Sequence, residues 1–180
     1  MDDADAIDLS ADQILFARDA ALRQLQFARD YTLQLAHTIP QTDWFTIPAG
    51  GKAHLAWYLG HLTVAEYGLM LFRQRGRAEI DTELMPGWFR KKFGKGSDPA
   101  QVDAGLATPE VVEQFMTRVH EESLRTVAAL GAETLWEPID MPYAAYPRKL
   151  GAVLFAPLHE MLHAGQIGSL RRGLGLEPIR

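Results

Sequence analysis

The chain has 180 residues, of which 47% are hydrophobic and 23% are charged, and this composition argues against wholesale disorder and against a fibrous repeat. Its 18 Lys and Arg residues against 23 Asp and Glu residues give a formal net charge of −5, which repels a phosphate backbone and disfavours nucleic-acid binding. The sequence contains no cysteine, so any bound metal must be held by imidazole and carboxylate groups.

The N-terminal segment is acidic and offers little to bury, so we expect residues 1–9 to form a mobile arm and residues 10–180 to form a single domain. The first residues lack the positive charge of a secretion signal, and no window reaches the roughly 18 consecutive apolar residues that a membrane span requires. We therefore expect a soluble protein without membrane partners. The absence of cysteine fits the reducing cytoplasm.

The first half of the chain carries the patterns of two long helices. Ser10 and Gln13 have the spacing of a capping box, and apolar residues on one helical stripe follow them. The spacing predicts a helix from Ser10 to about Thr38, before Pro40. A second helix is predicted over residues 53–75, which are rich in Leu, Ala, Trp and Tyr.

The segment after the second helix is predicted to be a long connector. From Gly76 to Ala107 the helical periodicity fades and Gly and Pro accumulate, with a short helix expected only around Trp88 to Phe93. A connector of about thirty residues can run the length of a helical bundle. It therefore allows the next helix to run parallel to the one before it.

Two further helices are predicted in the second half. Thr108 has the character of an N-cap followed by Pro109 at the first helical position, and this third helix is expected to end at Gly131. A proline-containing loop then leads to a fourth helix over residues 149–173, in which Pro157 is expected either to kink the helix or to mark its true start. No segment has the pattern of a strand, so the chain is predicted to be an all-α bundle.

Two of the six histidines, His159 and His163, lie one turn apart on the fourth predicted helix, where two imidazoles can bind one divalent ion. The pair alone is weak evidence, because six histidines can produce it by chance. Helical periodicity puts Leu158 and Leu162 beside the pair and Glu160 away from it, so both rings are expected to point into the bundle. Two buried imidazoles need partners, and a shared metal ion supplies one to each.

His61 is the candidate third ligand because it lies on an apolar face of the second helix. Three imidazoles with one position left for water are typical of catalytic zinc, although a hydrogen-bonded core histidine is the alternative interpretation. His54 lies about 10 Å before His61 along the helix, too far to bind the same ion, and is expected to line the entrance. Trp57 is expected beside the site, and Gln166 either to contact a ligand or to be a buried amide.

The fourth helix also spells H-E-x-x-H, a signature of zinc peptidases in which Glu160 would activate water. The further ligands of that class are missing downstream, so peptidase is the weaker interpretation. Glu160 is the candidate catalytic side chain of that motif. Glu66, five positions after His61, could also act as a base, although a surface charge is the simpler interpretation. His37 and His120 are expected to be ordinary surface residues.

Two motifs resemble a known family. W-Y-L-G-H-L at residues 57–62 and H-x-x-x-H-A-G-Q-I at residues 159–167, followed by L-R-R, resemble the DinB-like (YfiT-like) metalloenzyme superfamily. The resemblance implies a four-helix bundle in up-down-down-up order, with the long connector between helices 2 and 3, and a homodimer. It also implies a divalent metal ion, zinc or nickel, on three histidines, which in this sequence are His61, His159 and His163.

The same resemblance implies a metal-dependent enzyme that acts on a small molecule, because characterised relatives include transferases and isomerases that use low-molecular-weight thiols such as bacillithiol or mycothiol. The residues themselves equally allow a metal-dependent hydrolase, and a non-catalytic metal- or ligand-binding dimer is a further alternative. Acidic groups of such a thiol would be attracted to the basic run of the connector, although a solvated loop is the simpler interpretation of that run. The run consists of Arg90, Lys91, Lys92 and Lys95.

Overall fold

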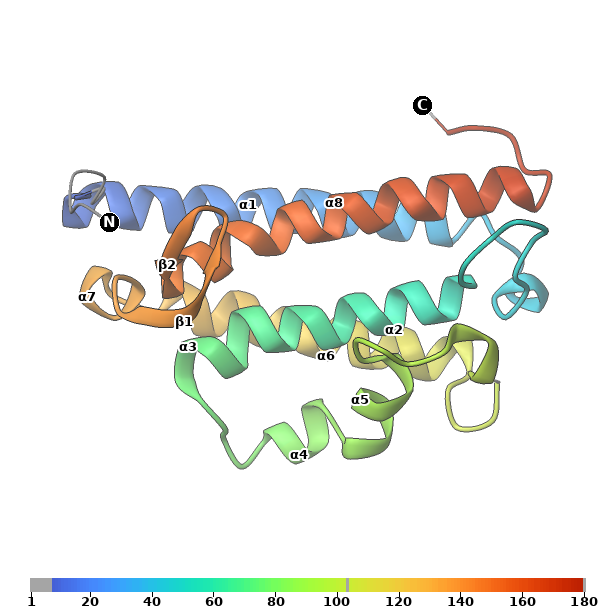
Figure 1. Ribbon diagram of the computed structural model, residues 1–180, viewed down its shortest axis with the longest axis horizontal. Helices are drawn as coiled ribbons and strands as arrows, with labels where there is room; N and C mark the ends of the chain where they lie inside the picture. Colours follow the sequence, from blue (N-terminus) through green and yellow to red (C-terminus); the bar gives the residue numbers. More distant parts are fainter. Residues whose placement is uncertain (1–7, 103, 180) are drawn as a thin grey trace.

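The computed structural model describes residues 8–102 and 104–179 and is mostly helical (Figure 1). The long helices are α1 (Ala11–Ala36), α2 (Leu55–Glu66), α6 (Pro109–Ala128) and α8 (Lys149–Gly173). The short ones are α3 (Arg73–Arg75), α4 (Asp81–Leu84), α5 (Gly87–Phe93) and α7 (Ala132–Leu135), with 3-10 turns at η2 (Gln41–Asp43) and η4 (Pro99–Gln101). The expected mobile arm falls largely on residues 1–7, which lie outside the described residues.

The long helices form two layers. Figure 1 shows α1 and α8 side by side in one layer and α2 and α6 in the other, and both pairs are in contact. The colour gradient runs in one direction along α1 and α8 and in the opposite direction along α2 and α6. The connector with α4 and α5 returns the chain to the end at which α2 begins, so α6 starts there. None of the described helices is long and apolar enough to cross a lipid bilayer.

The helix starts that the sequence predicts for α1 and α6 are confirmed. Ser10 Oγ accepts from the Gln13 amide at 3.3 Å, and Gln13 Oε1 accepts from the Ser10 amide at 2.9 Å, which completes the capping box. Thr108 Oγ1 accepts from the Val111 amide at 3.4 Å, with Pro109 at the first helical position. Local hydrogen bonding therefore fixes where these two helices begin.

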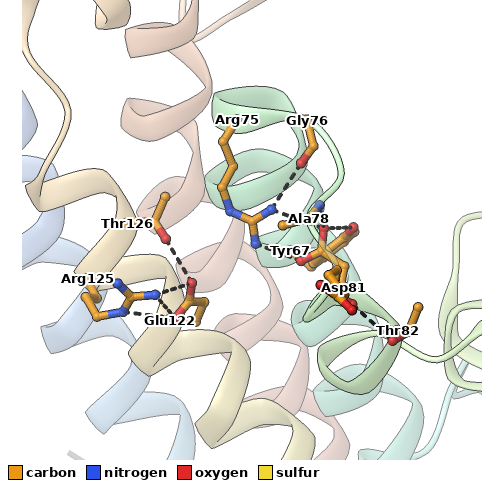
Figure 2. Close-up of polar contacts among 10 residues, drawn as sticks. Tyr67, Arg75, Gly76, Ala78, Asp81, Thr82, Glu122, Arg125 and Thr126 are labelled. Atoms are coloured by element: carbon orange, nitrogen blue, oxygen red, sulfur yellow. Dashed lines mark hydrogen bonds and ion pairs between the residues drawn. The ribbon is translucent and has the colours of Figure 1, made fainter.

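The helix that begins with α2 continues to Arg75, but residues Tyr67–Phe72 form a π-helix that the sequence did not indicate. Figure 2 shows how its end is held: Arg75 Nη2 lies 2.7 Å from Asp81 Oδ1, and the Tyr67 hydroxyl donates to Asp81 Oδ2 at 3.0 Å. Burial would raise the pKa of Asp81, but Arg75, the Ala78 amide and the Tyr67 hydroxyl lower it. The ionised carboxylate thus ties the end of the helix to the connector.

The prediction that the chain contains no strand is wrong at one place. β1 (Pro138–Tyr143) pairs antiparallel with β2 (Tyr146–Arg148) in a two-stranded hairpin. The turn consists of Ala144 and Ala145 with φ of 46° and 66°, so it lacks the glycine or asparagine by which such turns are recognised. The hairpin packs closely on α8, because a Cβ on Gly151 would overlap the carbonyl oxygens of two hairpin residues.

The orientation of α8 also differs from the prediction. The helix continues through Pro157, so that residue does not mark its start. Leu158 and Leu162 are each 58% exposed, whereas Glu160 is 2% exposed and pairs with Arg29 on α1. The prediction was wrong because it placed the leucines in the core and the charged residue on the surface. The sequence did not show that Arg29, on another helix, is a buried partner for the Glu160 carboxylate.

Candidate metal centre

Three imidazoles from two helices meet between α2 and α8. The candidate ligand nitrogens of His61, His159 and His163 all lie within 4.8 Å of one another. His159 Nε2 and His163 Nε2 are 3.3 Å apart. Two nitrogens bound to one tetrahedral zinc ion at about 2.0–2.1 Å would be separated by about the same distance. The structure thus brings together the three residues that the sequence singled out.

Two hydrogen bonds orient these rings. His61 Nδ1 donates to the Phe93 carbonyl oxygen at 3.0 Å, and His163 Nδ1 donates to Gln166 Oε1 at 2.7 Å. Each bond places the proton on Nδ1, so Nε2 carries the lone pair that can bind a metal ion. Gln166 is therefore a hydrogen-bond partner of His163 rather than a buried amide, since its side chain is exposed.

The electrostatics of the cluster keep the imidazoles neutral at pH 7. Burial, followed by the neighbouring His163 and His61, lowers the pKa of His159 to about 4. Burial and then His61 lower the pKa of His163 to about 4, against the hydrogen bond to Gln166. Burial also lowers the pKa of His61, although the Phe93 carbonyl opposes the shift. A histidine must be neutral to bind a metal ion, so three neutral imidazoles close together are suited to a shared metal cation.

The W-x-x-G-H segment of α2 builds the wall around His61. The Trp57 ring is stacked on His61 with centroids 4.8 Å apart and planes at 4°, and its Nε1 donates to Ser97 Oγ at 2.9 Å. A Cβ on Gly60 would overlap the Phe93 ring. Glycine is therefore required for α5 to approach α2 closely enough that the Phe93 carbonyl reaches His61.

His54 lies elsewhere. It is 1% exposed and caps α2, where Nδ1 accepts from the Trp57 amide at 3.1 Å. Its Nε2 donates to the carbonyl oxygens of Pro99 and Val102 at 3.0 and 3.1 Å. Burial lowers its pKa, so the ring stays neutral. His54 fixes the end of the connector to α2 and is not among the residues that line the pocket at the histidines.

A pocket of about 630 Å³ opens beside His61 and His159. Most of its lining is apolar, and within residues 8–102 and 104–179 no carboxylate is among the lining residues. Two cations, Arg73 and Lys95, complete the wall. Of the basic run in the connector, Lys95 thus lies at the site, whereas Arg90 lines a separate pocket beside Asp81.

The comparison with protein families agrees with this geometry. A family model for the DinB superfamily matches residues 24–167, which include all three histidines. The chain belongs to the DinB superfamily. Searches of curated proteins and of solved structures gave no match.

In this DinB-superfamily chain, Glu160 does not face the histidines. Arg29 on α1 donates to Glu160 Oε1 from Nε at 2.9 Å and to Oε2 from Nη2 at 3.1 Å. Both residues are at most 3% exposed. Glu160 is thus bound to a buried cation and is not free to accept a proton from water at the histidines.

The prediction that Glu66 and His120 lie on the surface is wrong, because both residues belong to the buried cluster around Arg29. Glu66 is 3% exposed and His120 is 6% exposed. Glu66 binds Arg29 at 2.7 Å and His120 Nδ1 at 2.9 Å, so this DinB-superfamily protein has a buried ionic cluster to which α1, α2, α6 and α8 each contribute one residue. Burial raises the pKa of Glu66, but Arg29 and His120 outweigh it and keep the carboxylate charged. His37 is exposed, as predicted.

The sequence did contain a signal for Arg29. It lies between Ala28 and Thr32 on the buried stripe of α1, where an unpaired charge would be strongly unfavourable. A cation at such a position requires buried acids on neighbouring helices. Which acids they are could not be read from the sequence, because Glu66 and Glu160 are 37 and 131 residues away.

Proposed function

We propose that this protein is a metal-dependent enzyme that transfers a low-molecular-weight thiol to a small-molecule substrate, with a divalent ion, zinc or nickel, on His61, His159 and His163. The observation that carries the proposal is the convergence of three neutral imidazoles, two of which, His61 and His159, line a largely apolar pocket. Imidazole ligands suit zinc and nickel. The family membership of the chain supports the same chemistry.

The fold that we propose to support this site is a four-helix bundle in up-down-down-up order. The pairing of α1 with α8 and of α2 with α6, and the return of the chain through the connector, support this order. In such a bundle α2 and α8 are neighbours. Ligands on these two helices can therefore share one ion without any contribution from a loop side chain.

The chain's own residues have defined tasks in this proposal. When bound, a divalent ion would lower the pKa of a thiol or water beside it. The Phe93 carbonyl and Gln166 keep the Nε2 lone pairs of His61 and His163 available. Trp57 covers one face of His61, and the largely apolar lining of the pocket beside His61 and His159 suits the apolar part of a small substrate.

The surroundings favour thiol transfer over peptide hydrolysis of the H-E-x-x-H type. Peptide hydrolysis at H-E-x-x-H needs a carboxylate that takes a proton from water. Here Glu160 is held by Arg29, and among the residues that the structure describes no carboxylate lines the pocket. A thiol has a pKa of about 8.5 against about 15.7 for water, so it is deprotonated beside a cation without such a base.

The test is turnover by the zinc- or nickel-loaded protein. Bacillithiol, mycothiol and cysteine are offered with monochlorobimane, which fluoresces when a thiol replaces its chloride, and an activated ester is offered in parallel. We expect metal-dependent thiol transfer that His163→Ala abolishes and His37→Ala preserves. Ester hydrolysis without thiol transfer would replace the proposal by a hydrolase. Tight metal binding without either reaction would favour a non-catalytic binding protein.

We also propose that the protein is a homodimer that associates through the outer face of α1 and α8. Phe27, Leu158 and Leu162 are 68%, 58% and 58% exposed. The ion pair of Arg29 with Glu160 sets these side chains at the same level of the two helices. Neighbouring exposed apolar side chains on paired helices are typical of a protein interface.

A further inference from the structure

Arg73 lies at the end of the pocket that is distant from the histidines. It directly follows the π-helix and comes twelve residues after His61 on one continuous helical segment, so their backbone positions are on the order of 15 Å apart along the axis, and the Arg73 guanidinium reaches back toward His61 as far as the Gly68 carbonyl. π-helical turns are frequent at functional sites because they redirect side chains that an α-helix would place elsewhere. The pocket thus extends from imidazoles at one end to a guanidinium at the other.

The guanidinium of Arg73 has hydrogen-bond donors without an acceptor within the described residues. It lies 5.0 Å from the centroid of the Tyr143 ring, and its one hydrogen bond within the described residues runs from Nη1 to the Gly68 carbonyl at 3.4 Å. Its Nε is buried without a partner. Arg75, two residues on, is by contrast paired with Asp81 at 2.7 Å. A buried donor without an acceptor is unfavourable, so Arg73 is poised for an incoming acceptor.

The charge of the pocket is positive. Lys95 is its second cation, and it lies near the histidine end because Phe93 and Ser97, on either side of it, contact His61 and Trp57. The wall between the two ends is apolar and includes Val64, Leu69, Met141 and Phe155. Because the described part of the chain contributes two cations and no acid to the lining, the charge of the wall favours an anion.

From these observations we infer that the pocket binds an elongated organic anion whose carboxylate pairs with Arg73 and whose apolar body lies between Phe155, Leu69 and Met141. This inference rests on the proposed function in that it names the substrate class for the same pocket. The opposite end of the ligand then points to His61 and His159. Bidentate pairing of a planar guanidinium with a carboxylate gives both affinity and orientation.

The inference is tested by calorimetry with the metal-free full chain, so that its outcome does not depend on the metal. Octanoate is the probe, and 1-octanol is the uncharged ligand of the same length. We expect octanoate to bind one per chain and more tightly than 1-octanol. Arg73→Met should weaken octanoate binding about tenfold or more and leave 1-octanol unchanged, because only the charged hydrogen bonds are lost. Arg73→Lys should have an intermediate effect.

The matched control is Arg77→Met, which removes the same charge from an exposed residue outside the pocket and should not change octanoate binding. Equal binding of octanoate and 1-octanol by the wild-type chain would overturn the inference, and so would unchanged octanoate binding by Arg73→Met. If Arg73→Met folds poorly, Arg73→Lys and the octanol comparison decide the question. His163→Ala should lose metal and still bind octanoate, so loss of the metal site and loss of the anion site are distinguishable.

Discussion

Arg29 holds both carboxylate oxygens of Glu160, from Nε at 2.9 Å and from Nη2 at 3.1 Å. The two residues come from α1 and α8 and are almost fully buried. A glutamate in the peptidase motif has to face the metal and its water. In this protein the residues of the motif therefore have two separate roles: the two histidines belong to the three-histidine cluster, while the glutamate joins two helices.

Replacement of this glutamate should affect stability more than metal binding. Glu160→Ala leaves Arg29 without one of its two buried partners, and we expect the free energy of unfolding to fall by about 3–5 kcal/mol. Urea denaturation measures this, with Glu79→Ala on the exposed connector as a control that should change it by less than about 0.5 kcal/mol. A stable Glu160→Ala protein that keeps metal but loses hydrolytic activity would instead restore the peptidase interpretation.

Glycine at position 60 should be essential for the approach of α5 to α2. A methyl group in Gly60→Ala would overlap the Phe93 ring, and such overpacking costs about 1–3 kcal/mol. Displacement of Phe93 also removes the hydrogen bond that orients His61, so metal affinity should fall as well. Thermal denaturation and metal titration measure the two effects.

The matched control for that variant is Gly165→Ala on α8. A Cβ on Gly165 has no atom within 4 Å, so the substitution should be neutral or stabilise the helix by up to about 1 kcal/mol. If both alanine variants behave alike, close packing of Phe93 on Gly60 is not what holds α5 in place.

The metal-free protein should lose stability as the pH falls from about 6.5 to about 4. The pKa of His159 and His163 is lowered to about 4 in the fold, against about 6.5 in an unfolded chain. Between these values the unfolded state binds more protons than the native state, so the free energy of unfolding rises with pH and levels off above about 6.5. Urea denaturation at several pH values should show a shallower slope for the double variant His159→Gln/His163→Gln. Identical slopes would contradict the burial of neutral imidazoles.

The helical pattern of the sequence predicted much of the fold, because local signals determine where helices begin and end. The Ser10 capping box and the Thr108 N-cap were recognisable for that reason. The hairpin was not recognisable, because its turn consists of two alanines with positive φ angles and contains no glycine or asparagine. The π-helix was not either, because its residues are apolar and compatible with an ordinary α-helix.

In the candidate site, too, local features could be predicted from the sequence and long-range contacts could not. The spacing of His159 and His163 reports their proximity, because residues i and i+4 are neighbours on any helix. The addition of His61 required a resemblance or an assumption about which helices face each other. Arg73 and the Phe93 carbonyl could not be anticipated, because their positions depend on the π-helix and on the path of the connector.

Association through the exposed apolar face of α1 and α8 predicts a dimer in solution. Leu162→Glu places a charge on this face and should give a folded monomer in analytical ultracentrifugation, with unchanged helical circular dichroism. Leu106→Glu is the control, because Leu106 is 69% exposed but lies in the connector. A wild-type monomer at high micromolar concentration would contradict this prediction.

The most direct test of the account is metal analysis of the purified protein and of His163→Ala after incubation with zinc or nickel and dialysis. We predict about one divalent ion per chain in the wild type and in His37→Ala, whose ring is exposed and distant from the cluster. His163→Ala should retain little metal, because the loss of one of three ligands sharply weakens binding. No stoichiometric metal in the wild type, or the same metal content in His163→Ala, would contradict the central claim.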